Sequence, residues 1–569
     1  MSPLDALDEQ QRRAASLLRG PVAVLAGAGA GKTRVITHRI AHGVDTGAYT
    51  PNRVMAVTFT AKAAGELRGR LRALGVEGVQ AKTFHAAALA QINFFWPTVT
   101  GDVAPTIVDN KVRLLAHAAD GLRLRPDTAT LRDVAAQIEW RKVTMRSIAQ
   151  YAILQRSVGA LTPSALVDLM RAYERVKDER RQLDFEDVLL ACAGMLEAEP
   201  QVTRAVREQY RHFTVDEYQD VSPLQSRLLD LWLGDRRDLC VVGDASQTIY
   251  SFTGAESRFL LDFERRYPDA TVVRLERNYR SAPAVIAVAN ALMRGRPGAL
   301  RLEPAPDAAA GDVPVVTGYH DEHFEAEGVA DAIVAQLETA APSDIAVLYR
   351  AHAQSAEIQD ALARRGVPTT VLGGRRFFDM PEVRQAVMAL RGAAISPGEG
   401  GFADTVRDVL RSLGHSDEAP AAGGALRDAW EARAAILRLA EEAAPGTTLR
   451  AFTEQLMARA KDQHEPTLRT VTLSTLHAAK GLEWPHVHLL GLAEGLLPIS
   501  YATSLEGVDE ERRLAYVGIT RARRSLSLSW PRASASGRLQ REPSRFLAEI
   551  GTGTLRAGAG SATRGSRRA

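Results

Sequence analysis

The sequence predicts an α/β protein with two parallel-sheet cores, each interrupted by a mainly helical insertion. Apolar strand-like runs alternate with helix-like stretches over residues 20–90, and the same alternation returns in the second half of the chain. This pattern is typical of parallel sheets. Residues 88–183 and 377–465 instead carry the apolar periodicity of helices and almost no strand-like runs. We therefore expect the two helical segments to be insertions into the two cores.

The first core is expected to start with a strand over 21–26, a helix over 31–42, a strand over 53–59 and a helix over 61–74. Other expected strands lie at 212–215, 238–243, 313–317, 345–349, 370–372, 471–475, 487–492 and 526–529, and the clearest insertion helices at 111–119 and 164–180. Gly/Pro/Ala-rich loops are expected at 395–401 and 418–424.

The expected boundaries follow from these elements: 1–88 and 184–279 for the first core, 89–183 for its insertion, 280–376 and 466–549 for the second core, and 377–465 for a reduced second insertion. The last residues, 550–569, are rich in Gly, Ala and Ser, and we expect a flexible basic tail.

Length and composition agree with several domains. A chain of 569 residues exceeds the roughly 100–200 residues of one domain, and its 46% hydrophobic and 24% charged residues exclude disorder throughout. No apolar run reaches the roughly 18 residues of a membrane helix, and the N-terminus lacks the apolar stretch of a signal peptide. Two cysteines, Cys192 and Cys240, cannot form a disulfide framework or a four-cysteine zinc site. A soluble, reduced, cytoplasmic protein is expected.

The charge balance is nearly neutral, at +3, so any surface for nucleic acid must be local. The choice of basic residue is more informative. Only eight of the 71 basic residues are lysine: Lys32, Lys62, Lys82, Lys111, Lys142, Lys177, Lys461 and Lys480. Where arginine is the usual base, a lysine can mark a place that needs a compact ammonium group.

A phosphate-binding loop follows the first strand. Residues 26–33 read AGAGAGKT, which fits the pattern GxxxxGK[ST] except that Ala26 stands at the first glycine position. Glycines let backbone N–H groups close around phosphate oxygens, and the next helix directs its positive end at them. Lys32 is expected at the β- and γ-phosphates and Thr33 at Mg²⁺. A Gly/Ala-rich turn is the alternative, and the flanking strand and helix make it unfavoured.

A second motif, FTVDEYQD at 213–220, ends another apolar strand. A phosphate loop needs an acid on a neighbouring strand to hold the metal, and Asp216 suits this role. Glu217 suits the general base that orients the attacking water. The alternative is an acid pair in a solvated loop, which we would favour if the phosphate loop were absent.

These motifs and seven further segments resemble the superfamily 1A DNA helicases of the UvrD/Rep/PcrA type. In order they are LDEQQRRA (7–14), AVTFTAKAA (56–64), TFH (83–85), VGDASQTIYSFTGA (242–255), LERNYRSAPAVIAVAN (275–290), VTLSTLHAAKGLEW (471–484) and EERRLAYVGITRAR (510–523). The resemblance covers nearly the whole chain and ends at 543–547, so it implies a shortened variant with a reduced second insertion and no C-terminal accessory domain.

The resemblance implies two RecA-like P-loop cores and an ATP- and Mg²⁺-dependent DNA helicase. It would move 3′→5′ on single-stranded DNA, in repair or replication. Single-stranded DNA, junctions of single and double strands, and repair proteins are the implied partners, with no membrane. Two alternatives stay open: a P-loop ATPase that translocates without effective unwinding, and one that acts on a partner other than nucleic acid. The residues alone leave DNA against RNA undecided.

The resemblance also implies a role for single residues at the nucleotide. Gln247 would sense the γ-phosphate, and Arg280 and Arg521 would reach it from the second core, so that ATP lies between the cores. An arginine there is worth roughly 10³–10⁵ in rate. The implied catalytic set is Lys32, Asp216, Glu217, Gln247, Arg280 and Arg521. The implied nucleotide-binding set is Gln11 (adenine edge), Ala26, Gly27, Ala28, Gly29, Ala30, Gly31, Lys32, Thr33, Arg34 (beside the base), Tyr279 (stacked on adenine) and Glu483 (ribose).

A strand-binding surface is expected at an aromatic pair. Tyr250 and Phe252 alternate at i and i+2, which places both rings on one side of an extended segment, and a translocase needs such stacking platforms. Two core aromatics are the alternative. By resemblance the strand is also lined by Thr60, Lys62, Phe84, His85, Thr475 and His477, although both histidines would also suit the interior.

Three positions depart from the family pattern. Phe252 stands where relatives usually have Trp, Thr253 where they often have Arg, and Ala61 where they often have Asn. The smaller ring at 252 and the reduced second insertion make translocation a firmer expectation than strong unwinding.

Overall fold

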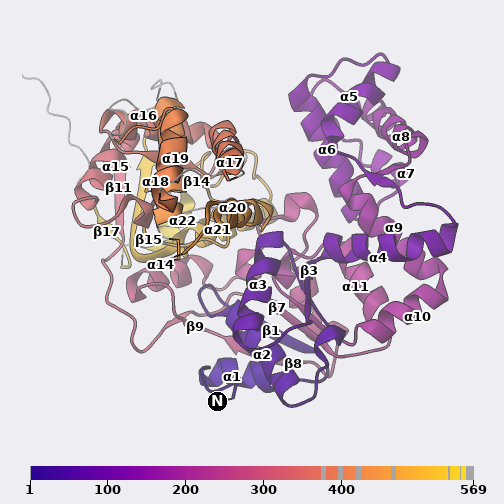
Figure 1. Ribbon diagram of the computed structural model, residues 1–569. Helices are drawn as coiled ribbons and strands as arrows, with labels where there is room; N and C mark the ends of the chain where they lie inside the picture. The colour runs from indigo at the N-terminus through magenta and orange to yellow at the C-terminus, as the bar shows by residue number, and fades with distance from the viewer. Residues whose placement is uncertain are drawn as a thin grey trace, which may run out of the picture. The chain divides into compact units, whose positions relative to one another are not determined.

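The computed structural model describes residues 2–372, 378, 380–394, 401–417, 425–441, 443–444, 446–462, 469–535, 539–551 and 553–558. The chain forms two compact units, Met1–Gly27 with Gly31–Leu275 and Ala28–Ala30 with Glu276–Ala569 (Figure 1). The loop expected at 418–424, most of the loop at 395–401 and the end of the tail, 559–569, lie outside the described residues. The expected flexible tail over 550–569 was wrong in its described part, because Arg556–Ala557 form strand β17 and pair with Val315 and Val316. No helix within the described ranges is both long and apolar enough for a membrane span.

The first unit contains a six-stranded parallel sheet in the order β3-β2-β6-β7-β1-β8. Its strands are β1 (Val22–Ala26), β2 (Val54–Thr58), β3 (Gln80–Thr83), β6 (His212–Val215), β7 (Leu239–Gly243) and β8 (Thr271–Leu275). The predicted α/β class is confirmed. Strands β3 and β8, at the two edges of the sheet, were not predicted, because an edge strand needs no continuous apolar run.

Helices cover this sheet: α1 (Glu9–Ser16), α2 (Lys32–Asp45), α3 (Ala61–Ala73), α4 (Phe84–Thr100), α9 (Phe185–Ala198), α10 (Pro200–Gln209), α11 (Pro223–Leu233), α12 (Arg258–Leu261) and α13 (Phe263–Arg266). Short 3-10 turns are η1 (Pro51–Arg53), η2 (Tyr218–Asp220), η3 (Ala245–Gln247) and η4 (Ser251–Thr253). Helix α4 continues across the expected boundary at residue 88, because Ala87, Ala88 and Ile92 pack into the buried cluster of the sheet.

The first insertion is a helical group with its own apolar core. Its helices are α5 (Lys111–Gly121), α6 (Thr128–Val143), α7 (Ile148–Ala152) and α8 (Pro163–Glu179), grouped together in Figure 1. Leu115, Ile138 and Leu166 are buried among them. Strands β4 (Thr106–Ile107) and β5 (Gln182–Leu183) pair in parallel where the chain enters and leaves the group. The core inside the group explains its helical periodicity.

The second unit holds a seven-stranded sheet in the order β13-β14-β12-β15-β16-β11-β17, and its pairs are parallel. The strands are β11 (Val315–Tyr319), β12 (Ile345–Tyr349), β13 (Thr369–Val371), β14 (Val471–Thr475), β15 (Trp484–Leu489), β16 (Ala522–Pro531) and β17 (Arg556–Ala557), while β9 (Arg277–Asn278) pairs with β10 (Glu303–Pro304). Strand β15 begins three residues before the expected start at 487, because Trp484 already pairs with Ala522.

The helices of this unit are α14 (Pro283–Met293), α15 (Glu322–Gln336), α16 (Ser355–Arg364), α21 (Leu505–Ile519) and α22 (Arg545–Ile550), with the 3-10 turns η5 (Pro342–Asp344) and η6 (His352–Gln354). The second insertion contributes α17 (Pro381–Ala393), α18 (Phe402–Ser412), α19 (Ala425–Glu441) and α20 (Leu449–Asp462). Val383, Leu410, Ile436 and Leu456 form its buried core.

A buried carboxyl group joins α15 to the second sheet. Glu325 accepts from Gly491 N at 2.9 Å and from Ser529 Oγ at 2.6 Å, and burial raises its pKa to about 7. Because the pKa of Glu325 is higher in the folded protein than in the unfolded chain, its protonated carboxyl stabilises the fold at pH values below the unfolded pKa. This stabilisation is lost as the pH rises through about 7.

Glu325→Gln keeps an acceptor oxygen for both donors and carries no charge. We therefore expect the difference in free energy of unfolding between the variant and the wild type to shift in favour of the variant from pH 5 to pH 8, by up to roughly 3 kcal/mol. Urea unfolding at both pH values measures this. Glu327, whose pKa is lowered by Arg364 and Arg365, supplies the control Glu327→Gln, for which little change is expected over this range. A pH-independent difference for Glu325→Gln would contradict the assignment.

Candidate functional site

The loop after β1 has the backbone geometry of a phosphate cradle. Gly31 has φ +82° and precedes α2, so the first turn of that helix is directed at the loop. A Cβ at Gly31 would lie 2.9 Å from Gln11 Nε2, and one at Gly29 would lie 2.7 Å from Asn278 Nδ2. Glycine is therefore required at both positions. Ala26 needs no such freedom, because it still pairs within the sheet with Leu275.

Strand order brings the acids of β6 toward this loop. Lys32 Nζ lies 3.8 Å from Glu217 Oε1, across the width of β7. Asp216 is buried, and burial followed by the charge of Glu217 raises its pKa to about 7, although Lys32 acts to lower it. Glu217 has φ +51°, a left-handed conformation that is uncommon outside glycine, and its N–H donates to Asp216 Oδ1 at 2.9 Å. Such strain is often found where a side chain must be aimed.

The carboxylates fit a divalent cation held partly by phosphate oxygens. Two acids face one lysine here, so the group has spare negative charge. Across the part of the chain that the structure describes, no three His, Cys, Asp or Glu side chains gather into a metal site. Mg²⁺ commonly uses one or two carboxylates together with substrate phosphates, and Asp216 with the Thr33 hydroxyl provides that limited set.

A buried polar chain connects Glu217 to the turn after β7. Gln219 Nε2 donates to Glu217 Oε2, and Gln219 Oε1 accepts from Asp244 N at 3.0 Å. Gln247 Nε2 donates to Asp244 Oδ2 at 2.7 Å. Gln219 and Asp244 lie within the motif segments at 213–220 and 242–255, but the sequence did not predict a role for either residue. The only sequence feature that could have indicated a role was their position close to Glu217 and Gln247 in the chain.

The remaining nucleotide residues of the first unit lie near the same loop. Gln11 is buried in α1 and closes a capping box with Asp8. Its amide reaches the loop at Gly31, as described above. Arg34 is exposed on α2 and donates to the carbonyl of Ala6. The segment before α1 and the phosphate loop therefore lie together.

The aromatic pair does not lie on an extended segment, and that prediction was wrong. Ser251–Thr253 form the 3-10 turn η4, because Thr253 N and Ala255 N both donate to the Tyr250 carbonyl. The rings of Tyr250 and Phe252 still meet, with centroids 6.2 Å apart and an interplanar angle of 60°. Burial raises the pKa of Tyr250 to about 12, whereas Phe252 is 62% exposed. Phe252 therefore presents the more exposed ring of the pair.

The residues that follow β2 and β3 divide into exposed and buried. Thr60 caps α3 by accepting from Ala63 N, and Lys62 is exposed on its first turn, so both are accessible to a phosphate. Phe84 is only 1% exposed and stacks on Trp232, with centroids 5.9 Å apart. The structure thus contradicts the expected contact of Phe84 with single-stranded DNA, because this ring belongs to the core.

Both histidines of the expected strand surface are held neutral. Burial lowers the pKa of His85 to about 4, and its ring lies 5.0 Å from that of Phe185. Burial, followed by the charges of Arg350 and Lys480, lowers the pKa of His477 to about 4. Neutral rings cannot neutralise phosphates, although they can stack or donate hydrogen bonds.

In the second unit the expected nucleotide residues contact one another. Arg280 Nε donates to Glu483 Oε2, so the structure gives the carboxylate that was assigned to ribose an arginine partner. Arg521 is 1% exposed and donates to the carbonyls of Val517 and Leu482 and to Thr520 Oγ1. It follows α21 and precedes β16, directly beside the start of β15.

Two expected residues of the second unit differ sharply in exposure. Tyr279 is 48% exposed, and its N–H donates to the Gly29 carbonyl at 3.0 Å. Thr475 ends β14 and is buried, with its hydroxyl accepting from Ala478 N at 3.3 Å. The Tyr279 ring is accessible for stacking, whereas the Thr475 hydroxyl caps the turn after its strand.

The contrast between two phenylalanines predicts their effects on stability. Phe84→Ala should lower the free energy of unfolding by about 3–5 kcal/mol, because it opens a cavity against Trp232. Phe252→Ala should change it by less than about 0.5 kcal/mol, because its ring is exposed. Denaturant unfolding of both variants measures this. An equal loss in the two variants would make Phe252 a core residue.

Comparison with known proteins places these features in one family. Residues 7–268 match the UvrD/REP helicase N-terminal domain, and residues 273–395 and 430–533 match the UvrD-like helicase C-terminal domain. The chain is 46% identical to "ATP-dependent DNA helicase UvrD2" of Mycobacterium tuberculosis, over 95% of this chain and 81% of that protein.

Two further relatives are more distant. The chain is 30% identical to "ATP-dependent DNA helicase PcrA" of Leuconostoc citreum, over 96% of this chain and 84% of that protein. It is 29% identical to "DNA helicase II" of Escherichia coli, over 96% and 88% of the two chains. The phosphate loop, the acid pair beside it and these matches together show that the chain belongs to the UvrD/REP helicase family.

Proposed function

We propose that this protein is an ATP-dependent DNA helicase that moves 3′→5′ on single-stranded DNA and works in DNA repair or replication. The observation that carries the proposal is the approach of Lys32 to Glu217, 3.8 Å apart, beside the strand that leads to Gln247 and Phe252. Family membership and the printed names of the relatives support it.

The side chains of the first unit suit distinct parts of ATP hydrolysis. Lys32 would bind the β- and γ-phosphates, and Thr33 with Asp216 would hold Mg²⁺, which neutralises charge on the phosphates when bound. Glu217 would orient the attacking water and accept its proton. The bond from Gln219 restrains the Glu217 carboxylate, so its direction does not depend on backbone strain alone.

The second unit would supply positive charge to the transferring phosphoryl group. We assign this role to Arg280 and Arg521, and Tyr279 to stacking on adenine. Since Arg280 is paired with Glu483, binding of a phosphate would replace one anionic partner by another. Such an exchange avoids leaving a guanidinium without a counter-charge.

Bases would stack on Phe252 while Thr60 and Lys62 bind the phosphates. Base stacking on an aromatic side chain is worth about 1–3 kcal/mol, enough to hold a nucleotide during part of a cycle. The hydrogen-bonded chain from Glu217 through Gln219 and Asp244 to Gln247 lies between the hydrolytic residues and this ring. It provides a physical route from phosphate to base.

Two assays on the full chain test the function. Single-stranded DNA should stimulate ATP hydrolysis, and forked DNA should be unwound from a 3′ tail and not from a 5′ tail. A rate of ATP hydrolysis that does not change when DNA is added would indicate a partner other than DNA. Stimulation without unwinding would identify a translocase.

Glu217→Gln should bind ATP and hydrolyse it at least about a hundredfold more slowly, which is the usual scale for loss of a general base. The carboxamide keeps the size of the side chain, and nucleotide binding measured by fluorescence should stay near the wild-type level. Lys32→Ala serves as the contrasting variant, because it should weaken binding as well as turnover. Wild-type turnover in Glu217→Gln would move the base elsewhere.

A further inference from the structure

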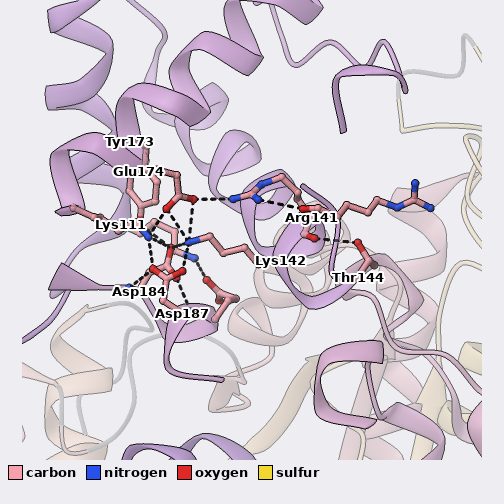
Figure 2. A network of polar contacts seen from close by, with 11 residues as sticks. Lys111, Arg141, Lys142, Thr144, Tyr173, Glu174, Asp184 and Asp187 are labelled. Carbon is pink, nitrogen blue, oxygen red and sulfur yellow. Dashed lines mark hydrogen bonds and ion pairs between the residues drawn. The ribbon is translucent and has the colours of Figure 1, made fainter. Parts of the chain in front are cut away.

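A buried ionic hub lies where the first insertion meets α9. We define the hub as Lys111, Arg141, Lys142, Glu174, Lys177, Asp184, Glu186 and Asp187, several of which Figure 2 shows converging with Tyr173. It contains four cationic and four anionic side chains. Three of the eight lysines of the chain are among them, in a protein whose usual base is arginine.

Lys142 is the central cation of the hub. It is 2% exposed, and its Nζ lies 2.7 Å from Asp184 Oδ2, 2.6 Å from Asp187 Oδ1 and 3.1 Å from Glu174 Oε1. A compact ammonium with three donors can meet three carboxylates at once, which a planar guanidinium does less readily. Asp184 and Asp187 form the capping box of α9, so Lys142 joins α6 and α8 to the first turn of α9.

The hub is strongly electrostatic. Burial acts to raise the pKa of Asp184, and Lys142, Lys111 and Lys177 outweigh it, so that this pKa lies well below its ordinary value. Helix α9 in turn packs into the sheet through Leu189. The hub therefore fixes the end of α6 relative to the sheet.

Helix α6 ends one residue after Lys142, against the turn that carries Phe252. A Cβ placed on Gly254 would lie 2.6 Å from Val143 Cγ2 and 3.4 Å from Thr144 Cγ2. Gly254 has φ +91° and closes η4, directly after Phe252 and Thr253. The aromatic segment thus contacts α6 at its far end, and Gln247 lies at its near end.

We propose that Lys142 is a positioning residue for DNA: it holds the end of α6 on α9, so that Val143 presses on Gly254 and sets the position of Phe252. The proposal rests on the stacking role proposed above for Phe252. The segment from Gln247 to Gly254 is then held at one end by the nucleotide side chains and at the other by the insertion. Movement at either end changes where the ring stands.

The first test compares two matched lysine variants of the full chain. Lys142→Met and Lys111→Met each remove one ammonium group from the hub, but Lys111 begins α5 and pairs with Glu186. Both variants should melt at a lower temperature. Well below those temperatures, Lys142→Met should need about tenfold more single-stranded DNA for half-maximal ATPase stimulation, the scale of a weakened stack. Lys111→Met should need the wild-type concentration.

A double-mutant cycle distinguishes positioning from a merely structural role. If Lys142 acts through Phe252, Lys142→Met should add little to the DNA requirement of Phe252→Ala. Additive effects, or an equal shift in Lys111→Met, would overturn the proposal. If Phe252→Ala alone leaves the DNA requirement unchanged, the stacking role of Phe252 is wrong as well. The single variant Phe252→Ala therefore distinguishes failure of the stacking role from failure of the positioning role of Lys142.

A second variant covers the case in which Lys142→Met does not fold. Val143→Ala removes both γ-methyl groups of Val143, including Cγ2, the one that lies nearest Gly254, and leaves every charge of the hub in place. It should reproduce part of the rise in DNA requirement, and again add little to Phe252→Ala. A wild-type DNA requirement in Val143→Ala would overturn the proposal by itself.

Discussion

The carboxyl ends of all strands in a parallel sheet lie at the same edge, and this constraint positions most of the functional side chains of the first unit. The order β3-β2-β6-β7-β1-β8 makes β1, β7 and β6 neighbours, so the phosphate loop, Gln247 and the acid pair gather at one part of that edge. Strands β2 and β3 continue the edge and lead to Thr60 and His85. The order of the β-strands thus places the residues expected to bind nucleotide next to those expected to bind DNA.

The sequence predicted those features that depend on backbone pattern. Residues 212–215, 345–349 and 471–475 are strands with the expected bounds, because each is rich in the β-branched and aromatic residues that favour strands. The phosphate loop was predictable, since only glycine fits at Gly29 and Gly31. Side-chain surroundings were not: Phe84 and Phe252 are the same residue type, yet one stacks on Trp232 and the other is exposed. Only tertiary packing distinguishes them.

The rarity of lysine in the sequence indicated that some lysines have a specific role, but it did not predict which ones. Its physical reason appears in the hub, where three ammonium groups meet carboxylates brought together from α8, the start of α9 and the turn before it. Burying such charges is costly unless every partner is present, so removal of one cation leaves carboxylates uncompensated. No local sequence pattern could have predicted this, because the partners are 32 to 45 residues apart in the chain for Lys142.

Two buried clusters of acids and lysines show how charge balance separates scaffold from site. In the hub the cations match the carboxylates, and the pKa of Asp184 and of Glu174 falls despite burial; Glu186, paired with Lys111, is the exception, with a pKa raised to about 7. Beside the phosphate loop, Asp216 and Glu217 face Lys32, and the pKa of Asp216 rises. A balanced cluster is complete in itself and holds helices together. An unbalanced one at the end of parallel strands has charge left to attract a cation, which is what Mg²⁺ with ATP would supply.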